Sequence, residues 1–392
     1  MYLADRMNNL GTETAFEVLA KAKAMEALGR NIIHLEIGEP DFPTPEHIAE
    51  AAVKAIREGF THYGPAAGLP ELREAIAHNV NHTRGNGVNI DLTQVVVTPG
   101  AKPIIFFTLL ALVQKGDEVL YPNPSFPIYE SMIRFCGAKP VPIRLLEEAN
   151  LQLDLDDLAS KITDRTKLII LNSPHNPAGC VMPWTQLETL SRLLQNRNDV
   201  YVLSDEIYKD IIYEGQHHSI ISLPNMTDRS IILDGFSKTY AMTGWRLGYG
   251  IFPKALTPHI IKLATNSVSC AASFSQRAAI QALEGPQDPV RAMVSELRDR
   301  RELIVKGLRR IPGIVCPNPE GAFYVFPNIK GTGISSHDFQ EQALSESGVA
   351  VLSGTSFGKY GEGYIRLSYA NSQENILEAL QRLETFVTTK IS

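Results

Sequence analysis

The sequence contains only four cysteines among its 392 residues, at Cys136, Cys180, Cys270 and Cys316. They lie far apart, and no CxxC pair or cluster of cysteine and histidine accompanies them. This spacing indicates neither a zinc site nor a disulfide framework. We therefore expect no metal, and a reducing compartment, the cytoplasm, in which such cysteines stay free.

Long apolar runs and an excess of positive charge are also missing. No apolar run reaches the roughly 18 to 20 residues of a membrane-spanning helix, and the N-terminal stretch lacks the apolar core of a signal peptide. The net charge is −6, which disfavours nucleic acid and anionic membranes as partners. The N-terminal stretch instead indicates a helical arm with apolar positions at Phe16, Leu19 and Ala20.

From about residue 94, short apolar strands alternate with helical segments. The strand patterns are "TQVVVT", "GDEVLY", "KPVPIRL", "KLIILN", "VYVLSD" and "SIILD". Buried strands that alternate with helices are typical of a parallel sheet covered on both faces. The sequence therefore predicts an α/β fold with a mostly parallel central sheet and helices on both of its faces.

Beyond about residue 290 the pattern changes to a long charged helix, two half-exposed strands ("GAFYVFPNI" and "YIRLSYA") and a terminal helix. This change predicts a second, smaller α+β domain. The stretch "NIIHLEIGEPDF" also lies outside the alternating block. We expect residues 1–47 to form an N-terminal arm and part of the small domain, 48–290 the large domain, and 291–392 the small C-terminal domain.

Two loops at strand ends carry polar groups suited to a ligand, which in open α/β sheets binds outside the carboxyl ends of the strands. Gly100, Ala101 and Lys102 open a helix, whose free backbone N–H groups attract phosphate; a plain strand-to-helix turn is the alternative. Asn176, in "LNSPHNPAG", lies between prolines and can direct its amide at a ligand. Ordinary loop chemistry is the alternative there.

Two further strand ends carry a carboxylate and a lysine. Asp205 ends the strand in "VLSDEIY", where an ionised carboxylate can hold a protonated ring nitrogen; a helix N-cap is the alternative. Lys238, in "SKTYAMTGWRLGY", lies among small residues and eight positions before Arg246. A lysine whose pKa is lowered by burial or by a cationic neighbour can act as a nucleophile, whereas most lysines are simply solvated.

Together and in this order, these stretches resemble a known family. The residues that carry the resemblance are "YGPAAGLPELREAIA", "NPAG", "DEIY", "SKTYAMTGWRLGY" and "YIRLSYA". They resemble the fold-type I, pyridoxal-phosphate-dependent aminotransferases of class I and II, in the aspartate-aminotransferase-like subgroup. The resemblance extends over nearly the whole chain. It implies pyridoxal 5′-phosphate as the cofactor and a homodimer as the assembly.

The resemblance also implies a role for individual residues. Lys238 would be the catalytic lysine, with Asp205 at the ring nitrogen of the cofactor and Tyr208 at its ring oxygen. The other cofactor-binding residues would be Gly100, Ala101, Lys102, Phe126, Asn176, Ser237 and Arg246, with Tyr63 reaching the phosphate in the neighbouring subunit. The substrate would be held by Gly38, Asn176 and Arg366, the last through its α-carboxylate.

Three positions need comment. Gly235 stands where many members of the family have a serine, so one hydrogen bond to the phosphate is expected to be missing. Ala178 replaces the usual threonine of its loop. His175 lies beside Asn176 and is a candidate acid–base group, but we expect Lys238 to carry the proton instead.

The implied reaction moves an amino group from an L-amino acid to a 2-oxo acid, with 2-oxoglutarate as the expected acceptor, by a ping-pong mechanism. Lys102 makes aspartate the first choice of donor, because a lysine at this place would meet the distal carboxylate; aromatic amino acids or alanine come next. An ungapped match places Glu17 at the same subsite. A glutamate there would either repel an acidic side chain or pair with Lys102 when no substrate is bound; a solvated Glu17 on the helix and a surface Lys102 are the alternative.

Two other functions remain compatible with this sequence. A C–S lyase or another α,β-eliminating enzyme can use the same lysine and cofactor on the same fold. A non-catalytic binding relative is the third possibility, and the intact set of Lys238, Asp205, Tyr208, Arg246 and Arg366 argues against it.

Overall fold

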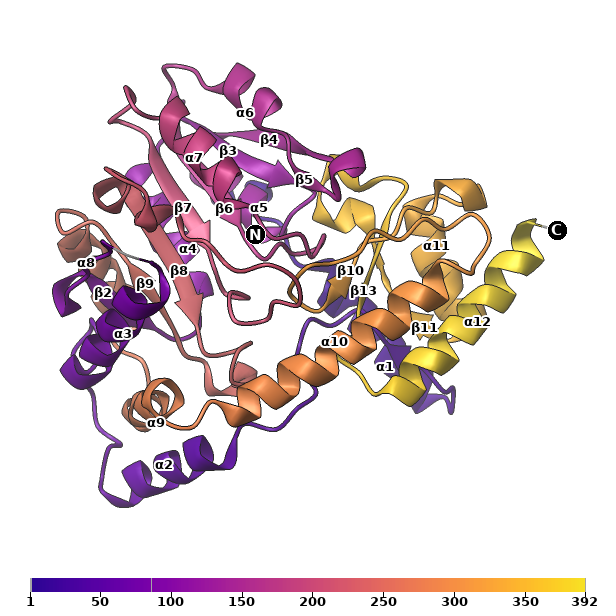
Figure 1. Ribbon diagram of the computed structural model, residues 1–392, viewed down its shortest axis with the longest axis horizontal. Coiled ribbons are helices and arrows are strands. Elements are labelled where there is room, and N and C mark those ends of the chain that lie inside the picture. The colour runs from indigo at the N-terminus through magenta and orange to yellow at the C-terminus, as the bar shows by residue number, and fades with distance from the viewer. Residues whose placement is uncertain (1, 86, 392) are drawn as a thin grey trace.

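An eight-stranded, mostly parallel sheet forms the centre of the larger lobe of the computed structural model (Figure 1), which describes residues 2–85 and 87–391. In spatial order its strands are β2 (Val95–Thr98), β9 (Gly248–Ile251), β8 (Ser230–Gly235), β7 (Tyr201–Asp205), β6 (Thr166–Asn172), β3 (Glu118–Asn123), β4 (Lys139–Leu146) and β5 (Gln152–Leu153). The strands from β8 to β4 run parallel, whereas β9 pairs antiparallel with both β8 and β2, and β5 pairs antiparallel with β4. The predicted α/β class is confirmed.

Helices cover both faces of this sheet. They are α3 (Pro70–Thr83), α4 (Lys102–Leu112), α5 (Ile128–Phe135), α6 (Leu155–Lys161), α7 (Trp184–Leu193), α8 (Thr257–Ser267) and α9 (Ser273–Glu284), and α2 (Glu46–Arg57) packs on α9. Neighbouring strand residues such as Ile169 and Ile170 enter two different hydrophobic clusters. One cluster contains α4, α5 and α8, and the other contains α3, α7 and α9. Burial on both faces explains why the strands read as continuous apolar runs.

A smaller lobe combines both ends of the chain. Its sheets are β10 (Tyr324–Val325), β13 (Ile365–Ser368) and β12 (Leu352–Ser353), and β1 (Ile33–His34) with β11 (Val349–Ala350). Its helices are α1 (Thr14–Ala27), α10 (Asp288–Leu308), α11 (Ser336–Gln342) and α12 (Gln373–Ile391). Figure 1 shows α10 running from the larger lobe to α12, on which it packs. The domain boundaries given above stay a prediction.

Two details of the smaller lobe differ from the prediction. The strands expected to be half-exposed, β10 and β13, are buried along their whole length, because they lie inside this lobe with helices around them. In α1, Phe16 is 58% exposed, whereas Val18 and Ala22 are buried and join a cluster with residues of the smaller lobe. The arm therefore packs through a different helix face from the predicted one.

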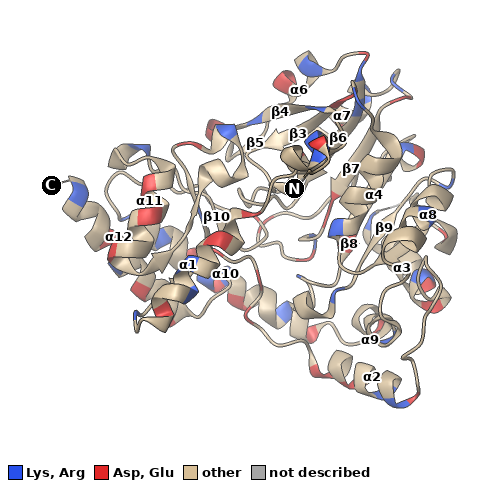
Figure 2. Ribbon diagram, turned by 180° about the vertical axis from the view of Figure 1, so that it is seen from behind, with Lys and Arg blue, Asp and Glu red and all other residues tan. Residues whose placement is uncertain are grey.

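Charged residues of both signs are mixed over the two lobes, as Figure 2 shows. Among the described residues, no helix combines the length and the hydropathy needed to cross a bilayer. Within the same residues, no three histidine, cysteine or acidic side chains are grouped so that they could hold a metal ion.

Candidate active site

A cavity of about 460 Å³ lies at the carboxyl edge of the parallel strands, where the two lobes meet. Its volume is within the range of small-molecule sites. The predicted site residues in its wall are Gly38, Ala101, Lys102, Phe126, Asn176, Asp205, Tyr208, Ser237, Lys238, Arg246 and Arg366. The fold therefore brings together residues that lie more than 300 positions apart in the chain.

Lys238 lies three residues beyond the end of β8 and is partly buried. Its Nζ donates a hydrogen bond to the carbonyl oxygen of Gly38 at 2.6 Å. Burial lowers the pKa of the Lys238 amine to about 8, and the charges of Arg366 and Arg246 act in the same direction. About a tenth of this amine is therefore neutral at pH 7, in the form that a nucleophile or proton acceptor requires.

Asp205 ends β7 and is 5% exposed. Its carboxylate accepts hydrogen bonds from the Tyr129 hydroxyl at 2.6 Å and from the backbone N–H of Ile207 at 3.2 Å. Burial raises the pKa of Asp205 to about 7. A carboxylate in this environment gains stability from a protonated nitrogen beside it, which suits a pyridinium ring.

The turn before α4 and Arg246 form a cradle for an anion. Gly100 has a φ of +81°, and a Cβ at this position would lie 2.4 Å from Nη2 of Arg246, so glycine is required for the guanidinium to approach. Ala101 is the N-cap of α4 and provides no side-chain cap, which leaves backbone N–H groups of the first turn for a ligand. Ser237 lies in the same wall. Together these groups can bind a phosphate.

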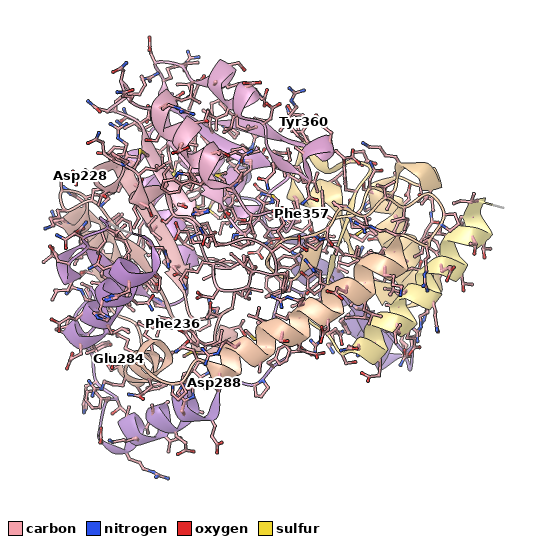
Figure 3. The ribbon with its side chains drawn as sticks, viewed as in Figure 1. Asp228, Phe236, Glu284, Asp288, Phe357 and Tyr360 are labelled. Carbon is pink, nitrogen blue, oxygen red and sulfur yellow. The ribbon has the colours of Figure 1, made fainter. Side chains whose placement is uncertain are left out.

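Arg366 of β13 is buried between two rings, those of Tyr324 at 4.6 Å and Phe357 at 5.0 Å; Figure 3 labels Phe357 between the lobes. Its Nη1 lies 3.4 Å from the Asn176 side-chain oxygen, and its Nη2 donates to the carbonyl of Glu36. Its buried Nε has no partner among the described residues. A buried guanidinium with a free N–H is suited to a carboxylate ligand.

Tyr208 reaches across to the smaller lobe. Its hydroxyl lies 2.7 Å from the hydroxyl of Tyr324 in β10, and both residues line the cavity. The predicted site omitted Tyr324, and it also omitted Tyr129 and Glu13. Tyr129 lies three residues after Phe126 in "SFPIYES", so the stacking position predicted for Phe126 was the signal that could have found it. For Tyr324 the sequence offers no comparable signal.

The acidic neighbour of Lys102 is Glu13, which corrects the prediction of Glu17. Lys102 Nζ forms an ion pair with the Glu13 carboxylate at the cavity wall. Glu17 is exposed, because α1 turns Val18 and Ala22 inward and Glu17 therefore points to solvent. Glu13 precedes the helix in extended backbone, from which its side chain reaches Lys102.

The remaining predicted positions lie outside the cavity wall. His175 is buried beside a second, small cavity, and burial lowers its pKa to about 3, so it is neutral and separate from Lys238. A Cβ on Gly235 would lie 3.0 Å from the Gly248 backbone of β9, which favours glycine there. Ala178 is buried in a hydrophobic cluster. Tyr63 is 92% exposed.

Comparisons with known proteins agree with this geometry. The family model of the class I and II aminotransferases matches residues 30–383. An aspartate aminotransferase of Pyrococcus horikoshii is 40% identical over 386 residues, which are 98% of this chain and 96% of that protein. An aromatic-amino-acid aminotransferase of Thermococcus litoralis is 39% identical across 100% of this chain and 99% of its own.

A solved structure is similar along the whole chain. An alanine aminotransferase from Pyrococcus furiosus has a TM-score of 0.94 to this chain at 37% identity, over 99% of this chain and 100% of the other. These comparisons give no support to the lyase alternative. The chain therefore belongs to the class I and II aminotransferases, which use pyridoxal 5′-phosphate to move an amino group from an amino acid to a 2-oxo acid.

Proposed function

We propose that this cavity binds pyridoxal 5′-phosphate and that Lys238 is the catalytic lysine. When bound, the cofactor supplies an electron sink for the negative charge that forms at the substrate α-carbon. The phosphate would be bound by Arg246, Ser237 and the backbone of Gly100, Ala101 and Lys102. Asp205 would bind the ring nitrogen, Tyr208 and Asn176 the ring oxygen, and Phe126 would pack on the ring.

One observation carries this proposal. A single cavity holds the partly buried amine of Lys238, the buried carboxylate of Asp205 and the free Nε of Arg366. The partners of Asp205 among the described residues are a hydroxyl and an amide rather than a cation. Each of these groups lacks a partner that the cofactor or an amino acid would supply.

The residues of the cavity then have separate roles in the reaction. Arg366 binds the α-carboxylate of the amino acid through its free Nε and a neighbouring N–H, assisted by Gly38 and Asn176. Lys238 Nζ, which is neutral in part because its pKa is about 8, accepts the proton from the substrate α-carbon. The rings of Tyr324 and Phe357 lie against the Arg366 guanidinium, which is 4% exposed, so its attraction for a carboxylate is screened less by water.

For the amino donor we propose aspartate, with 2-oxoglutarate as the acceptor. Lys102 Nζ is a cation in the cavity wall and lies 5.5 Å from the ring of Phe126, where it can meet a distal carboxylate. The aspartate aminotransferase of Pyrococcus horikoshii supports this choice by its name. Glu13 pairs with Lys102, and the acidic side chain of a bound donor would take the place of Glu13.

An aromatic donor is the second candidate. The pairing of Lys102 with Glu13 neutralises the wall, and apolar side chains line the same cavity, among them Phe16, Ile37, Ile105 and Phe126. The relative from Thermococcus litoralis is named for aromatic amino acids. If Lys102 and Glu13 stay paired when the donor binds, the site favours a neutral aromatic ring over a second carboxylate.

The ratio of kcat/KM for aspartate and phenylalanine decides between these donors. If Lys102 binds the distal carboxylate, Lys102→Ala should lower kcat/KM for aspartate roughly tenfold to a hundredfold, as expected for a hydrogen bond to a charged group, and hardly change it for phenylalanine. Glu13→Gln should raise the value for aspartate. An equal loss for both donors in Lys102→Ala would favour the aromatic donor.

We further propose an obligate homodimer in which Tyr63 completes the site of the partner. Tyr63 is 92% exposed, and Val53 and Ile56 are exposed apolar residues on the preceding helix. Sedimentation of the active enzyme as a monomer would contradict the proposal. A cytoplasmic location is proposed as well, which the four free cysteines support.

Mixed dimers test whether Tyr63 acts across the interface. A dimer of one Lys238→Ala chain and one Tyr63→Ala chain retains one intact site only if Tyr63 serves the other subunit. Mixing these variants should therefore raise activity above the sum of the two. Mixing Lys238→Ala with Arg246→Ala is the control, because both residues line the cavity of one chain and no mixed dimer retains an intact site.

A further inference from the structure

The hydroxyl groups of Tyr208 and Tyr324 meet inside the cavity wall. Their oxygens are 2.7 Å apart, and the two rings are nearly perpendicular at 84°. Tyr208 comes from the loop after β7 in the larger lobe, and Tyr324 from β10 in the smaller lobe. One hydrogen bond between two buried phenols therefore joins the lobes at the site.

The number of protons available decides which hydroxyl is the donor in the hydrogen bond between Tyr208 and Tyr324. A phenol has one proton to donate and two lone pairs that accept. If Tyr208 donates to the ring oxygen of the cofactor, its only proton is used there, and its oxygen must accept from Tyr324. Among the described residues, Tyr324 is the one hydrogen-bond partner of the Tyr208 hydroxyl. A donor behind it both orients and polarises the Tyr208 O–H, because linked hydrogen bonds strengthen one another.

The position of the Tyr324 side chain is closely determined by its surroundings. A Cβ on Gly38 would lie 2.0 Å from the Tyr324 hydroxyl oxygen, so the backbone of Gly38 packs directly against the phenol. The carbonyl of Gly38 accepts the hydrogen bond from Lys238. The ring of Tyr324 also lies 4.6 Å from the Arg366 guanidinium. One side chain thus contacts the groups assigned to the cofactor and the group assigned to the substrate carboxylate.

We infer that Tyr324 is a positioning residue with two separable parts: its hydroxyl directs the Tyr208 proton to the ring oxygen of the cofactor, and its ring holds Arg366 for the substrate carboxylate. This inference rests on the proposed function. It assigns to the smaller lobe an influence on the ionisation of the cofactor that is exerted through Tyr208.

Two substitutions separate the parts. Tyr324→Phe removes the hydroxyl and keeps every ring contact, whereas Tyr324→Leu removes both. Tyr369→Phe is the matched control, because the Tyr369 hydroxyl is buried and donates to the Ala322 carbonyl at 3.2 Å, outside the cavity wall. For each holoenzyme we would titrate the absorbance of the bound cofactor from pH 5 to 10 and measure KM for the amino donor.

Tyr324→Phe should move the midpoint of the absorbance titration upward by about 0.1 to 0.6 unit, because loss of the donor behind Tyr208 weakens its hydrogen bond to the anionic ring oxygen by roughly 10–30%, with KM nearly unchanged. Tyr324→Leu should show the same shift and, in addition, a KM raised by about threefold to thirtyfold, because the cation–π contact with Arg366 is lost. Tyr369→Phe should change neither.

Specific outcomes would overturn the inference. An unchanged midpoint in Tyr324→Phe, or an equal shift in Tyr369→Phe, would remove the hydroxyl from any role at Tyr208. An unchanged KM in Tyr324→Leu would remove the ring from any role at Arg366. These results leave the proposed function intact. If the parent chain shows no cofactor absorbance at all, the proposed function fails and the inference fails with it.

Discussion

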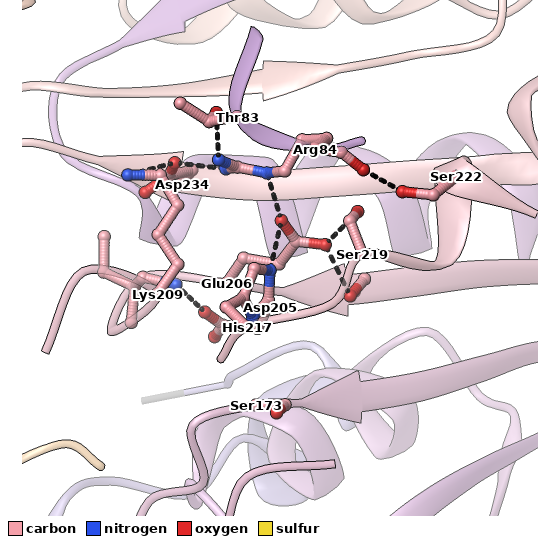
Figure 4. A network of polar contacts seen from close by, with 12 residues as sticks. Thr83, Arg84, Ser173, Asp205, Glu206, Lys209, His217, Ser219, Ser222 and Asp234 are labelled. Atoms are coloured by element: carbon pink, nitrogen blue, oxygen red, sulfur yellow. Dashed lines mark hydrogen bonds and ion pairs between the residues drawn. The ribbon is translucent and has the colours of Figure 1, made fainter. Parts of the chain in front are cut away.

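Arg84 Nε donates to the carboxylate of Glu206 at 2.7 Å, and the two side chains are 1% and 0% exposed (Figure 4). Nη2 of the same guanidinium donates to Asp234 at 2.7 Å. Arg84 follows α3, Glu206 follows β7 and Asp234 lies in β8. One buried cation therefore ties the carboxyl ends of the two strands that lead to Asp205 and Lys238.

Arg84→Met should destabilise the cofactor-free chain at pH 7 by about 3–5 kcal/mol, because it removes the buried guanidinium that pairs with two buried carboxylates and leaves them only His217 and Lys209 as basic neighbours. The control is Arg144→Met. Arg144 pairs with Asp154, but its side chain is 58% exposed, so its removal should cost less than about 1 kcal/mol. Urea denaturation of both variants measures the difference. Equal losses would show that the Arg84 network contributes no more than a surface pair.

The same network predicts a pH dependence of stability. Burial alone would raise the pKa of Glu206, but Arg84 and His217 outweigh burial and lower it to about 2. A carboxylate with a lowered folded-state pKa stabilises the fold above its unfolded pKa, and this contribution is lost as pH falls through the folded value. The parent should therefore lose the Glu206 contribution between about pH 4.5 and 2. In Arg84→Met, Glu206 has lost its guanidinium partner and is more easily protonated, so the stability gap to the parent should shrink on acidification.

Lys238→Ala should lower kcat by at least about a thousandfold, since it removes the proposed nucleophile and proton acceptor together. Cofactor binding should remain measurable, because Arg246 and the α4 amides are untouched. Lys254→Ala is the control. Lys254 pairs with Asp91 at the surface, where its side chain is 65% exposed. Turnover of Lys238→Ala within tenfold of the parent would refute the assignment of the catalytic lysine.

Asp205→Asn should slow removal of the α-proton by orders of magnitude, because the amide cannot hold a protonated ring nitrogen by charge. Tyr129→Phe should have a smaller effect in the same direction, since the Tyr129 hydroxyl lowers the pKa of Asp205 against the larger influence of burial. Single-turnover mixing with an amino acid, followed by absorbance, gives both rates. A normal rate in Asp205→Asn would mean that the ring nitrogen has another partner.

Six strands of the central sheet, β2, β3, β4, β6, β7 and β8, could be predicted because each is a short apolar run. Strand β9, which lies between β2 and β8, could not, since its sequence "GYGI" contains two glycines and no β-branched run. Glycine is required there for close packing: a Cβ on Gly248 would lie 2.6 Å from the backbone nitrogen of Ala101. A glycine that allows two backbones to approach closely has no side chain from which a strand could be predicted.

The candidate site likewise contains residues that could be predicted from the sequence and residues that could not. Residues within a family motif, such as Lys238 and Arg246, could be placed from the sequence. Glu13 could not, because the start of α1 decides which of two glutamates one turn apart faces Lys102. Tyr324 was missed because a tyrosine in an apolar strand reads as core, and only the pairing of β10 with β13 brings it beside Arg366.

The final prediction concerns the pH dependence of cofactor uptake by the cofactor-free chain. Burial lowers the pKa of the Lys238 amine to about 8 and raises that of Asp205 to about 7. The amine reacts only when it is neutral, above about pH 8, and Asp205 attracts a pyridinium only when it is charged, above about pH 7. Both groups therefore favour uptake as pH rises.

The rate of uptake should increase at least about tenfold per pH unit below 7, because the neutral fraction of an amine falls by that factor for each unit below its pKa. It should level off above about pH 8. Non-covalent uptake by Lys238→Ala serves as the control, since it retains Asp205 and the ionisation of the cofactor phosphate. The difference between the two curves isolates the amine. A difference curve with its midpoint near pH 10 would show an ordinary, solvated lysine, and would contradict the proposal that burial beside Arg366 and Arg246 activates Lys238.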